Sequence, residues 1–116
     1  MKNICYSLLL LLAAFHTHAQ EAKHRKAPDP QKPIQVVEAS CGQCNFNMEG
    51  DGCELAIRIN GKPYWIDGTS IDQHGDAHGK YGFCNTIRKA EVQGIVTGGR
   101  FMANYFKLLP PGKKRK

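Results

Sequence analysis

The residues best equipped for chemistry are four cysteines in the middle of the chain, in the pattern Cys41-x2-Cys44-x8-Cys53-x30-Cys84. Cysteine side chains form cross-links and bind soft or borderline metal ions. His74 and His78 fall inside the last interval of the pattern. A fifth cysteine, Cys5, lies near the N-terminus, apart from the others. The pattern therefore indicates either a metal site or a set of disulfides.

The metal hypothesis treats Cys41 and Cys44 as a knuckle, in which two cysteines separated by two residues bind one ion. Cys53 and Cys84 would complete a tetrahedral site of four thiolates, in which His78 or His74 could replace one ligand. Zinc suits such a set, and copper(I), which thiolates also favour, is the alternative metal. The pattern holds one Cys-x-x-Cys knuckle, whereas four-cysteine zinc sites usually have a second.

Disulfides are the alternative hypothesis, and in that case the cluster binds no metal. Four cysteines allow three pairings, and the sequence does not choose among them. A bond from Cys84 to an earlier cysteine would close a loop of 30 or more residues, worth roughly 3–4 kcal/mol in the chain-entropy model. A redox-active Cys-Gly-Gln-Cys motif is a third and weaker hypothesis. It needs a helix after its first cysteine, which Gly50 and Gly52 disfavour.

The two histidines between Cys53 and Cys84 have a less specific signal. His74 and His78 are four residues apart, which would place them on one face of a helix. Gly75 and Gly79 instead favour a solvated polar loop. No serine or threonine stands beside a base in a nucleophile motif. We therefore expect a binding domain rather than an enzyme.

Alternation of apolar and polar residues predicts the elements that must hold the cysteines. Strands are expected at residues 34–41, 55–59, 63–67, 90–97 and 100–109. Tight turns are expected at Asn60-Gly61 and Gly98-Gly99, and a crossover with short helical turns at 68–85. Five strands with a helical crossover after the third predict an all-β fold, an OB-like five-stranded small barrel over residues 34–109.

This topology makes a prediction about the cysteines. If neighbouring strands alternate in direction, the first and third strands end at the same end of the barrel. Cys41, Cys44 and Cys53 follow the first strand, and Cys84 lies in the crossover after the third. We therefore expect all four sulfur atoms to converge. A hydrophobic core in so small a domain supplies only about 3–5 kcal/mol, so a metal or a cross-link would matter to its stability.

The N-terminus predicts export. Residues 1–19 are expected to form a secretory signal peptide, with Lys2 before an apolar run at 8–14 and a small-residue cleavage site at its end. The mature chain would then be periplasmic or secreted, without Cys5, in a compartment that permits disulfides. The apolar run is about half as long as a membrane-spanning helix, so no membrane span is expected.

The excess of positive charge is expected to lie outside the barrel. Residues 20–33 should form a flexible leader, because polar residues and prolines cannot bury a core, and residues 110–116 a basic tail. The formal net charge is +6, yet residues 34–109 hold seven Lys or Arg against eight Asp or Glu. We therefore expect no specific nucleic-acid binding, although Trp65 is the aromatic side chain expected to be most exposed. The expected partner is a metal ion or an unknown exported protein.

Four short stretches form a combined pattern: residues 41–44 (Cys-Gly-Gln-Cys), 52–56 (Gly-Cys-Glu-Leu-Ala), the step from His78 to Cys84, and 92–94 (Val-Gln-Gly). The pattern resembles a family of small exported bacterial proteins classed as a domain of unknown function. In that family a Cys-x-x-Cys and a third cysteine open the domain, and a His…Cys step precedes a terminal hairpin. The resemblance covers about residues 39–110 and implies that the four cysteines belong to the fold.

These observations together predict an exported, non-enzymatic binding domain whose four-cysteine cluster binds zinc or copper. The alternative is a disulfide-stapled interaction module that holds no metal.

Overall fold

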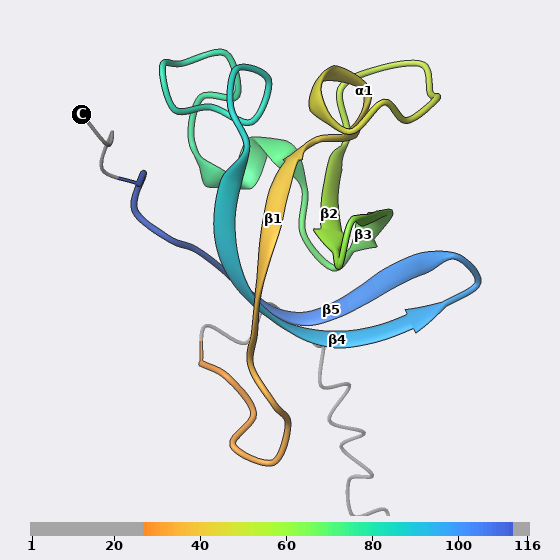
Figure 1. Ribbon diagram of the computed structural model, residues 1–116. Helices are drawn as coiled ribbons and strands as arrows, with labels where there is room; N and C mark the ends of the chain where they lie inside the picture. The colour runs from red at the N-terminus through yellow and green to blue at the C-terminus, as the bar shows by residue number, and fades with distance from the viewer. Residues whose placement is uncertain (1–26, 113–116) are drawn as a thin grey trace, which may run out of the picture.

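The computed structural model describes residues 27–112, which fold into a closed five-stranded barrel (Figure 1). The elements are β1 (Gln35–Cys41), α1 (Gly42–Asn45), β2 (Leu55–Ile59), β3 (Lys62–Asp67), the 3-10 helix η1 (Ile71–His74), β4 (Arg88–Thr97) and β5 (Arg100–Leu108). The strands are joined in the order β1-β2-β3-β5-β4, and β4 closes on β1. Only β3 and β5 pair in parallel among these strands. This confirms the predicted all-β, OB-like barrel with a short helical crossover.

The two tight turns have the backbone conformation that their sequences predict. Asn60 and Gly61 join β2 to β3 with φ values of 50° and 82°. Gly98 and Gly99 join β4 to β5 with φ values of 58° and 76°. Two successive positive φ values match the twist of the strands on either side, which explains why these residue pairs occur there. The strands begin and end within two residues of the positions expected.

The core lies inside the barrel and is filled by alternate residues of the strands. Cys41 of β1, Ile57 of β2, Val92 of β4 and Phe101 of β5 are each at most 1% exposed. Phe83 of the crossover is 2% exposed and belongs to the same apolar cluster. The first cysteine of the cluster is therefore a core residue, fixed by the packing of the barrel around it.

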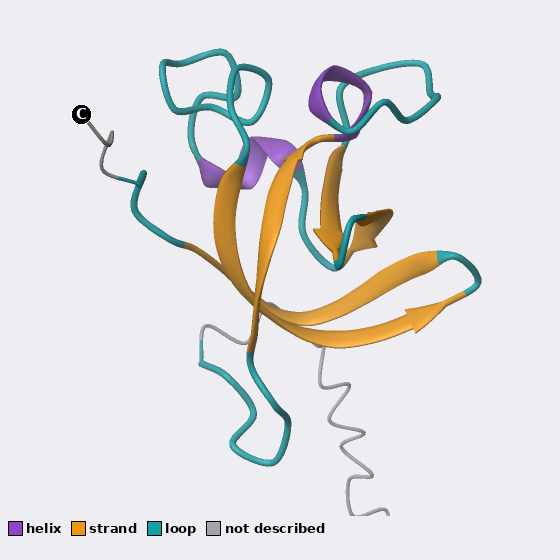
Figure 2. Ribbon diagram, viewed as in Figure 1, coloured by secondary structure: helices purple, strands orange, loops and turns teal. Residues whose placement is uncertain are grey.

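The two ends of the barrel carry different segments. The helix α1, which follows the end of β1, and the loops of the crossover lie together at one end (Figure 1, Figure 2). The segment that precedes β1 lies at the opposite end. The antiparallel pairings of β1 with β2 and of β2 with β3 produce this arrangement. The topological condition for bringing the four cysteines together is met.

The segment before β1 is attached to the barrel by Gln93 of β4. The side-chain amide of Gln93 accepts a hydrogen bond from the N–H of Asp29 and donates to the carbonyl groups of Asp29 and Lys32, each at 2.8 Å. Gln93 is only 1% exposed. Residues 29–32, which were expected to belong to a flexible leader, therefore contact the barrel.

Several predictions fall on residues 1–26 and 113–116, which lie outside the described residues. They are the signal peptide at 1–19, the first half of the leader and the end of the basic tail. Within residues 27–112, no helix combines the length and the hydropathy that crossing a membrane would require.

Candidate metal centre

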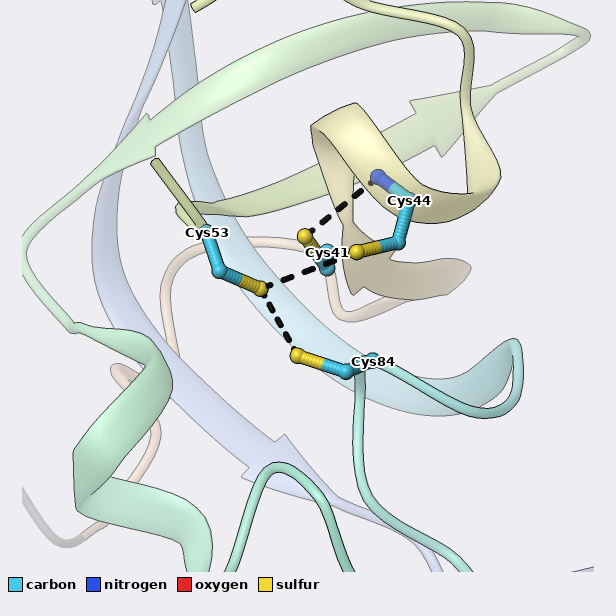
Figure 3. Close-up of side chains that lie close together, drawn as sticks. All are labelled: Cys41, Cys44, Cys53 and Cys84. Carbon is cyan, nitrogen blue, oxygen red and sulfur yellow. Dashed lines mark hydrogen bonds between the residues drawn. The ribbon is translucent and has the colours of Figure 1, made fainter. Parts of the chain in front are cut away.

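The four cysteines of the sequence pattern meet at one end of the barrel (Figure 3). Their Sγ atoms all lie within 4.8 Å of one another. The Sγ atom of Cys53 is 4.0 Å from that of Cys44 and 2.8 Å from that of Cys84. Cys41 is buried, Cys44 is exposed, and the other two are half-buried. The cluster therefore extends from the core of the barrel to its surface.

A single helical turn after β1 places the first two cysteines. Cys41 is the N-cap of α1, and its Sγ atom accepts a hydrogen bond from the N–H of Cys44 at 3.4 Å. The N–H groups of Phe46 and Met48 both donate to the carbonyl of Gly42 at 3.1 Å, which closes the turn. This turn is a local helix where the sequence predicted none. Its N–H donor favours the ionised form of Cys41, which is the form that binds a metal ion.

Trp65 of β3 covers this turn. A Cβ atom built on Gly42 would lie 2.5 Å from Cζ3 of Trp65 and 2.9 Å from Sδ of Met48, so only glycine fits at this position. Trp65 is half-buried rather than exposed. The expectation of an exposed ring is therefore corrected: the indole packs on the cysteine turn, because residues 42–48 fold back over the outer face of β3.

A reciprocal pair of hydrogen bonds positions Cys53. The N–H of Gly42 donates to the carbonyl of Glu54 at 2.9 Å, and the N–H of Glu54 donates to Oε1 of Gln43 at 3.0 Å. Oε1 of Gln43 also lies 3.7 Å from the Sγ atom of Cys41. Gln43, which stands between the two knuckle cysteines, thereby connects the turn to the strand that follows the third cysteine.

Three hydrogen bonds to one carbonyl group position Cys84. The carbonyl of Phe83 accepts from the N–H of Cys41 at 3.0 Å, from Oγ of Ser40 at 2.7 Å and from Nδ2 of Asn45 at 3.0 Å. Nδ2 of Asn45 also donates to Oγ of Ser40 at 2.8 Å. Ser40 is fully buried and Phe83 is 2% exposed. The crossover is therefore anchored to the end of β1 immediately before Cys84.

Proximity shifts the pKa values of the thiols in opposite directions. Burial raises the pKa of Cys41, but hydrogen bonds from Cys53 and Cys44 outweigh it and hold that pKa below its ordinary value. The hydrogen bond to Cys41 raises the pKa of Cys44 to about 11. Burial, and then the contact with Cys41, raises the pKa of Cys53. A cation at the centre of the cluster would replace the protons that these neighbours retain.

The structure does not place the histidines with the cysteines. His78 is exposed and is not part of the group of clustered ligand atoms, and its backbone N–H donates to Oδ1 of Asp76 at 2.9 Å. The ring of His74 lies 4.6 Å from that of Phe106. Nε2 of His74 lies 2.7 Å from Oγ1 of Thr69. Of the five predicted ligands, the described structure thus brings together the four cysteines and leaves His78 apart.

Sequence analysis did not single out Ser40, Gln43 and Asn45, which position the cluster. Each of them directly precedes or follows a cysteine of the knuckle. That adjacency is the one signal that could have identified them, because their strand and loop positions look solvated by alternation alone.

No curated protein and no solved structure matches this sequence. A family model with the description "Family of unknown function (DUF6370)" matches residues 35–109. The matched segment is more than half of the chain and contains all four clustered cysteines. This confirms the resemblance to a domain family of unknown function, and the chain belongs to that family.

Proposed function

We propose that the protein is an exported, non-enzymatic metal-binding domain in which four cysteine thiolates hold one Zn²⁺ ion. The observation that carries this proposal is the convergence of four Sγ atoms from three chain segments, all within 4.8 Å of one another. The ligands are Cys41 and Cys44 from the turn after β1, Cys53 from the loop before β2, and Cys84 from the crossover. Four thiolates are a common ligand set of structural zinc sites.

The positions of the sulfur atoms fit such an ion after a small local adjustment. Zn–S bonds of about 2.3 Å place the sulfurs of a regular tetrahedron about 3.8 Å apart. The separation of Cys44 and Cys53, 4.0 Å, is close to this value. Cys53 and Cys84, at 2.8 Å, would have to separate by roughly 1 Å. Gly52, which precedes Cys53, is exposed, and a Cβ atom built on it would meet no atom within 4 Å, so there is room beside this residue for the adjustment.

The ligand set supports a structural rather than a catalytic role. Catalytic zinc sites keep one position open for water or substrate, whereas four thiolates fill a tetrahedral ion. An ion bound here would join the end of β1, the loop before β2 and the crossover. In a small barrel, the free energy of metal binding adds directly to the free energy of folding.

Export is supported by the sequence pattern at the N-terminus, where Lys2 precedes an apolar run at residues 8–14. Cleavage after Ala19 would yield a mature chain that begins at Gln20. Expression of the full-length gene product in a bacterium, fractionation of the cells and intact-mass measurement test this part of the proposal. A cytosolic product that retains residues 1–19 would contradict it.

The binding proposal is tested by zinc titration of the reduced protein after removal of weakly bound metal. We expect one zinc per chain. Replacement of one ligand in Cys84→Ser should remove roughly a quarter of the 10–16 kcal/mol typical of structural zinc sites, and so weaken binding about 100- to 1,000-fold. His78→Gln is the matched control and should bind zinc as the wild type does. A protein that retains no zinc, or equal losses in both variants, would contradict the proposal.

The same titration with copper(I) under anaerobic conditions tests the choice of metal. A zinc site should show the visible absorption bands of a tetrahedral four-thiolate complex when Co²⁺ is substituted. Displacement of zinc by one equivalent of copper(I) in the presence of a physiological thiol would instead assign the site to copper.

A further inference from the structure

We infer that the cluster is a metal–disulfide switch: when the metal leaves under oxidising conditions, Cys53 and Cys84 form a disulfide, and its reduction restores the metal site. This inference rests on the proposed zinc binding. The co-reactant is a disulfide, either a small molecule or a protein, of the kind found in exported compartments.

The distance between the two sulfur atoms carries the inference. The Sγ atoms of Cys53 and Cys84 are 2.8 Å apart and face each other across the cluster (Figure 3). A disulfide bond is about 2.05 Å long, and two sulfurs on one tetrahedral zinc are about 3.8 Å apart. The observed separation lies between these values. A movement of about 1 Å in one direction makes the covalent bond, and a movement of about 1 Å in the other makes the metal site.

The surroundings of the other two cysteines select this pair. Cys41 is buried, and its Sγ atom contacts the N–H of Cys44 and Oε1 of Gln43. Cys44 is exposed, but its Sγ atom lies farther from Cys53, at 4.0 Å. Cys53 and Cys84 are both half-buried, so an oxidant in solvent can reach them. The pair that lies closest to bond length is thus also the pair that a co-reactant can attack.

The reaction balances with the disulfide as oxidant. The thiolate of one of the two cysteines attacks the disulfide, which forms a mixed disulfide and releases one thiolate of the oxidant. The thiolate of the second cysteine then attacks the protein sulfur of that bond, forms the Cys53–Cys84 bond and expels the second thiolate. Two electrons pass to the oxidant, any thiol protons pass to the released thiolates, and Zn²⁺ leaves without a change of oxidation state.

The two states exclude each other but hold the same segments together. The bond uses two of the four metal ligands, so the oxidised chain cannot form the tetrahedral site. It also joins the loop before β2 to the crossover, as the ion would. The loop before β2 and the crossover are therefore connected in both states, by the zinc ion in one and by the disulfide in the other.

The test exposes the mature full-length chain to glutathione disulfide, either zinc-loaded or after chelation of the zinc. Free thiols are then alkylated in denaturant, and the chain is cut with glutamyl endopeptidase and trypsin. The relevant peptides are 39–49, which contains Cys41 and Cys44, 50–54, which contains Cys53, and 81–88, which contains Cys84. In the zinc-free sample we expect 50–54 joined to 81–88, with 39–49 alkylated at both cysteines. In the zinc-loaded sample this bond should form at least 10-fold more slowly.

Two variants and one reversal complete the experiment. Cys44→Ser retains both members of the pair and should still form the bond, whereas Cys84→Ser should not. Reduction of the oxidised wild type should restore binding of one zinc per chain. If zinc binds but oxidation joins 39–49 to another peptide, or closes Cys41 onto Cys44, the switch is wrong and the metal site stands. If the Cys53–Cys84 bond forms but the reduced chain binds no zinc, the proposed function fails and the switch fails with it.

Discussion

At each end of the barrel, side chains hold a loop or segment against the strands. Only at one end do these side chains use all their polar atoms in hydrogen bonds within the protein. At the end where β1 begins, Gln93 is buried and its amide hydrogens and oxygen are all used in hydrogen bonds. At the opposite end, the sulfur atoms of four cysteines all lie within 4.8 Å of one another, and two pairs of them are in contact. The first arrangement is complete within the protein, whereas the second has the composition and spacing of a ligand set.

This difference between the two ends indicates that the cysteine end, and not the Gln93 end, requires a bound cation. A buried amide that is fully hydrogen-bonded stabilises one conformation and has no further binding capacity. Four thiols in mutual contact cannot all ionise unless a cation neutralises them. We therefore expect perturbations at the cysteine end to depend on metal and redox conditions. Perturbations at the Gln93 end should not depend on either.

Removal of the metal should have the largest effect. In reducing buffer, zinc at 100-fold excess over its dissociation constant stabilises the folded state by about 2.7 kcal/mol, and tighter binding adds to this. Addition of a chelator should therefore lower the melting temperature of the wild type by several degrees, as measured by calorimetry. Cys84→Ser should melt at nearly the same temperature with and without the chelator. A wild type whose melting is insensitive to chelation would remove the distinction between the two ends.

Gln93→Ala should have the next largest effect and no dependence on metal. The substitution removes three hydrogen bonds that hold residues 29–32, so we expect a loss of about 2–3 kcal/mol in denaturant unfolding. Zinc affinity should stay within twofold of the wild type. In a chain that begins at Pro33, the same substitution should cost much less, because its partners are absent. An equal cost in both backgrounds would show that the contact with residues 29–32 contributes nothing.

Asn45→Ala should perturb the cysteine end without removing a ligand. The side chain of Asn45 bonds Ser40 and the carbonyl of Phe83, next to Cys84. Its loss should lower zinc affinity about 10-fold, as is typical for groups that orient metal ligands, and stability by about 1–2 kcal/mol. Asn85→Ala is the matched control, because the side chain of Asn85 donates to the carbonyls of His78 and Gly79, within the crossover itself. Equal losses of zinc affinity in both variants would contradict the assigned role of Asn45.

The smallest expected effect is the loss of the ion pair between Glu38 of β1 and Arg58 of β2, on the side of the barrel. A hydrogen bond from Arg58 holds the pKa of Glu38 below its ordinary value. The folded-state pKa is thus lower than the unfolded one, so the pair stabilises the fold above about pH 4.3, and this is lost as the pH falls through the folded-state pKa. The pair is partly solvated, and Glu38→Gln should cost less than about 1 kcal/mol near pH 7. At a pH well below the folded-state pKa of Glu38, the melting curves of the two chains should converge; a difference that persists there would exclude the ion pair as its cause.

The barrel and the meeting of the cysteines could be predicted because both follow from local patterns. The alternation of Leu55 to Ile59 and the turn at Asn60-Gly61 each depend on residues adjacent in the chain. Once strand directions were set, the position of Cys84 beside Cys53 followed from topology. The signal for these features therefore lies in short stretches of sequence.

The contacts that the sequence did not predict depend on single polar side chains and partners far along the chain. Gln93 forms hydrogen bonds with Asp29 and Lys32, which lie 64 and 61 positions earlier in the chain. No sequence pattern distinguishes Gln93 from a solvated strand residue. Asn45 reaches a carbonyl 38 positions away. His78 was predicted as a ligand from spacing alone, but spacing does not specify the direction of a side chain in an irregular loop. The expectation that Trp65 is exposed was wrong because residues 42–48 cover its ring. This is a tertiary contact, which the alternation of residues within one strand does not reveal.

X-ray absorption spectroscopy at the zinc edge of the stoichiometrically loaded, reduced protein would show whether four cysteine sulfurs bind one zinc ion. We expect four sulfur neighbours at about 2.3 Å and no nitrogen or oxygen neighbour. Cys44→Ser should give three sulfurs and one light atom, and His78→Gln should reproduce the wild-type spectrum. A wild-type shell with fewer than four sulfurs, or one that changes in His78→Gln, would contradict the four-thiolate site.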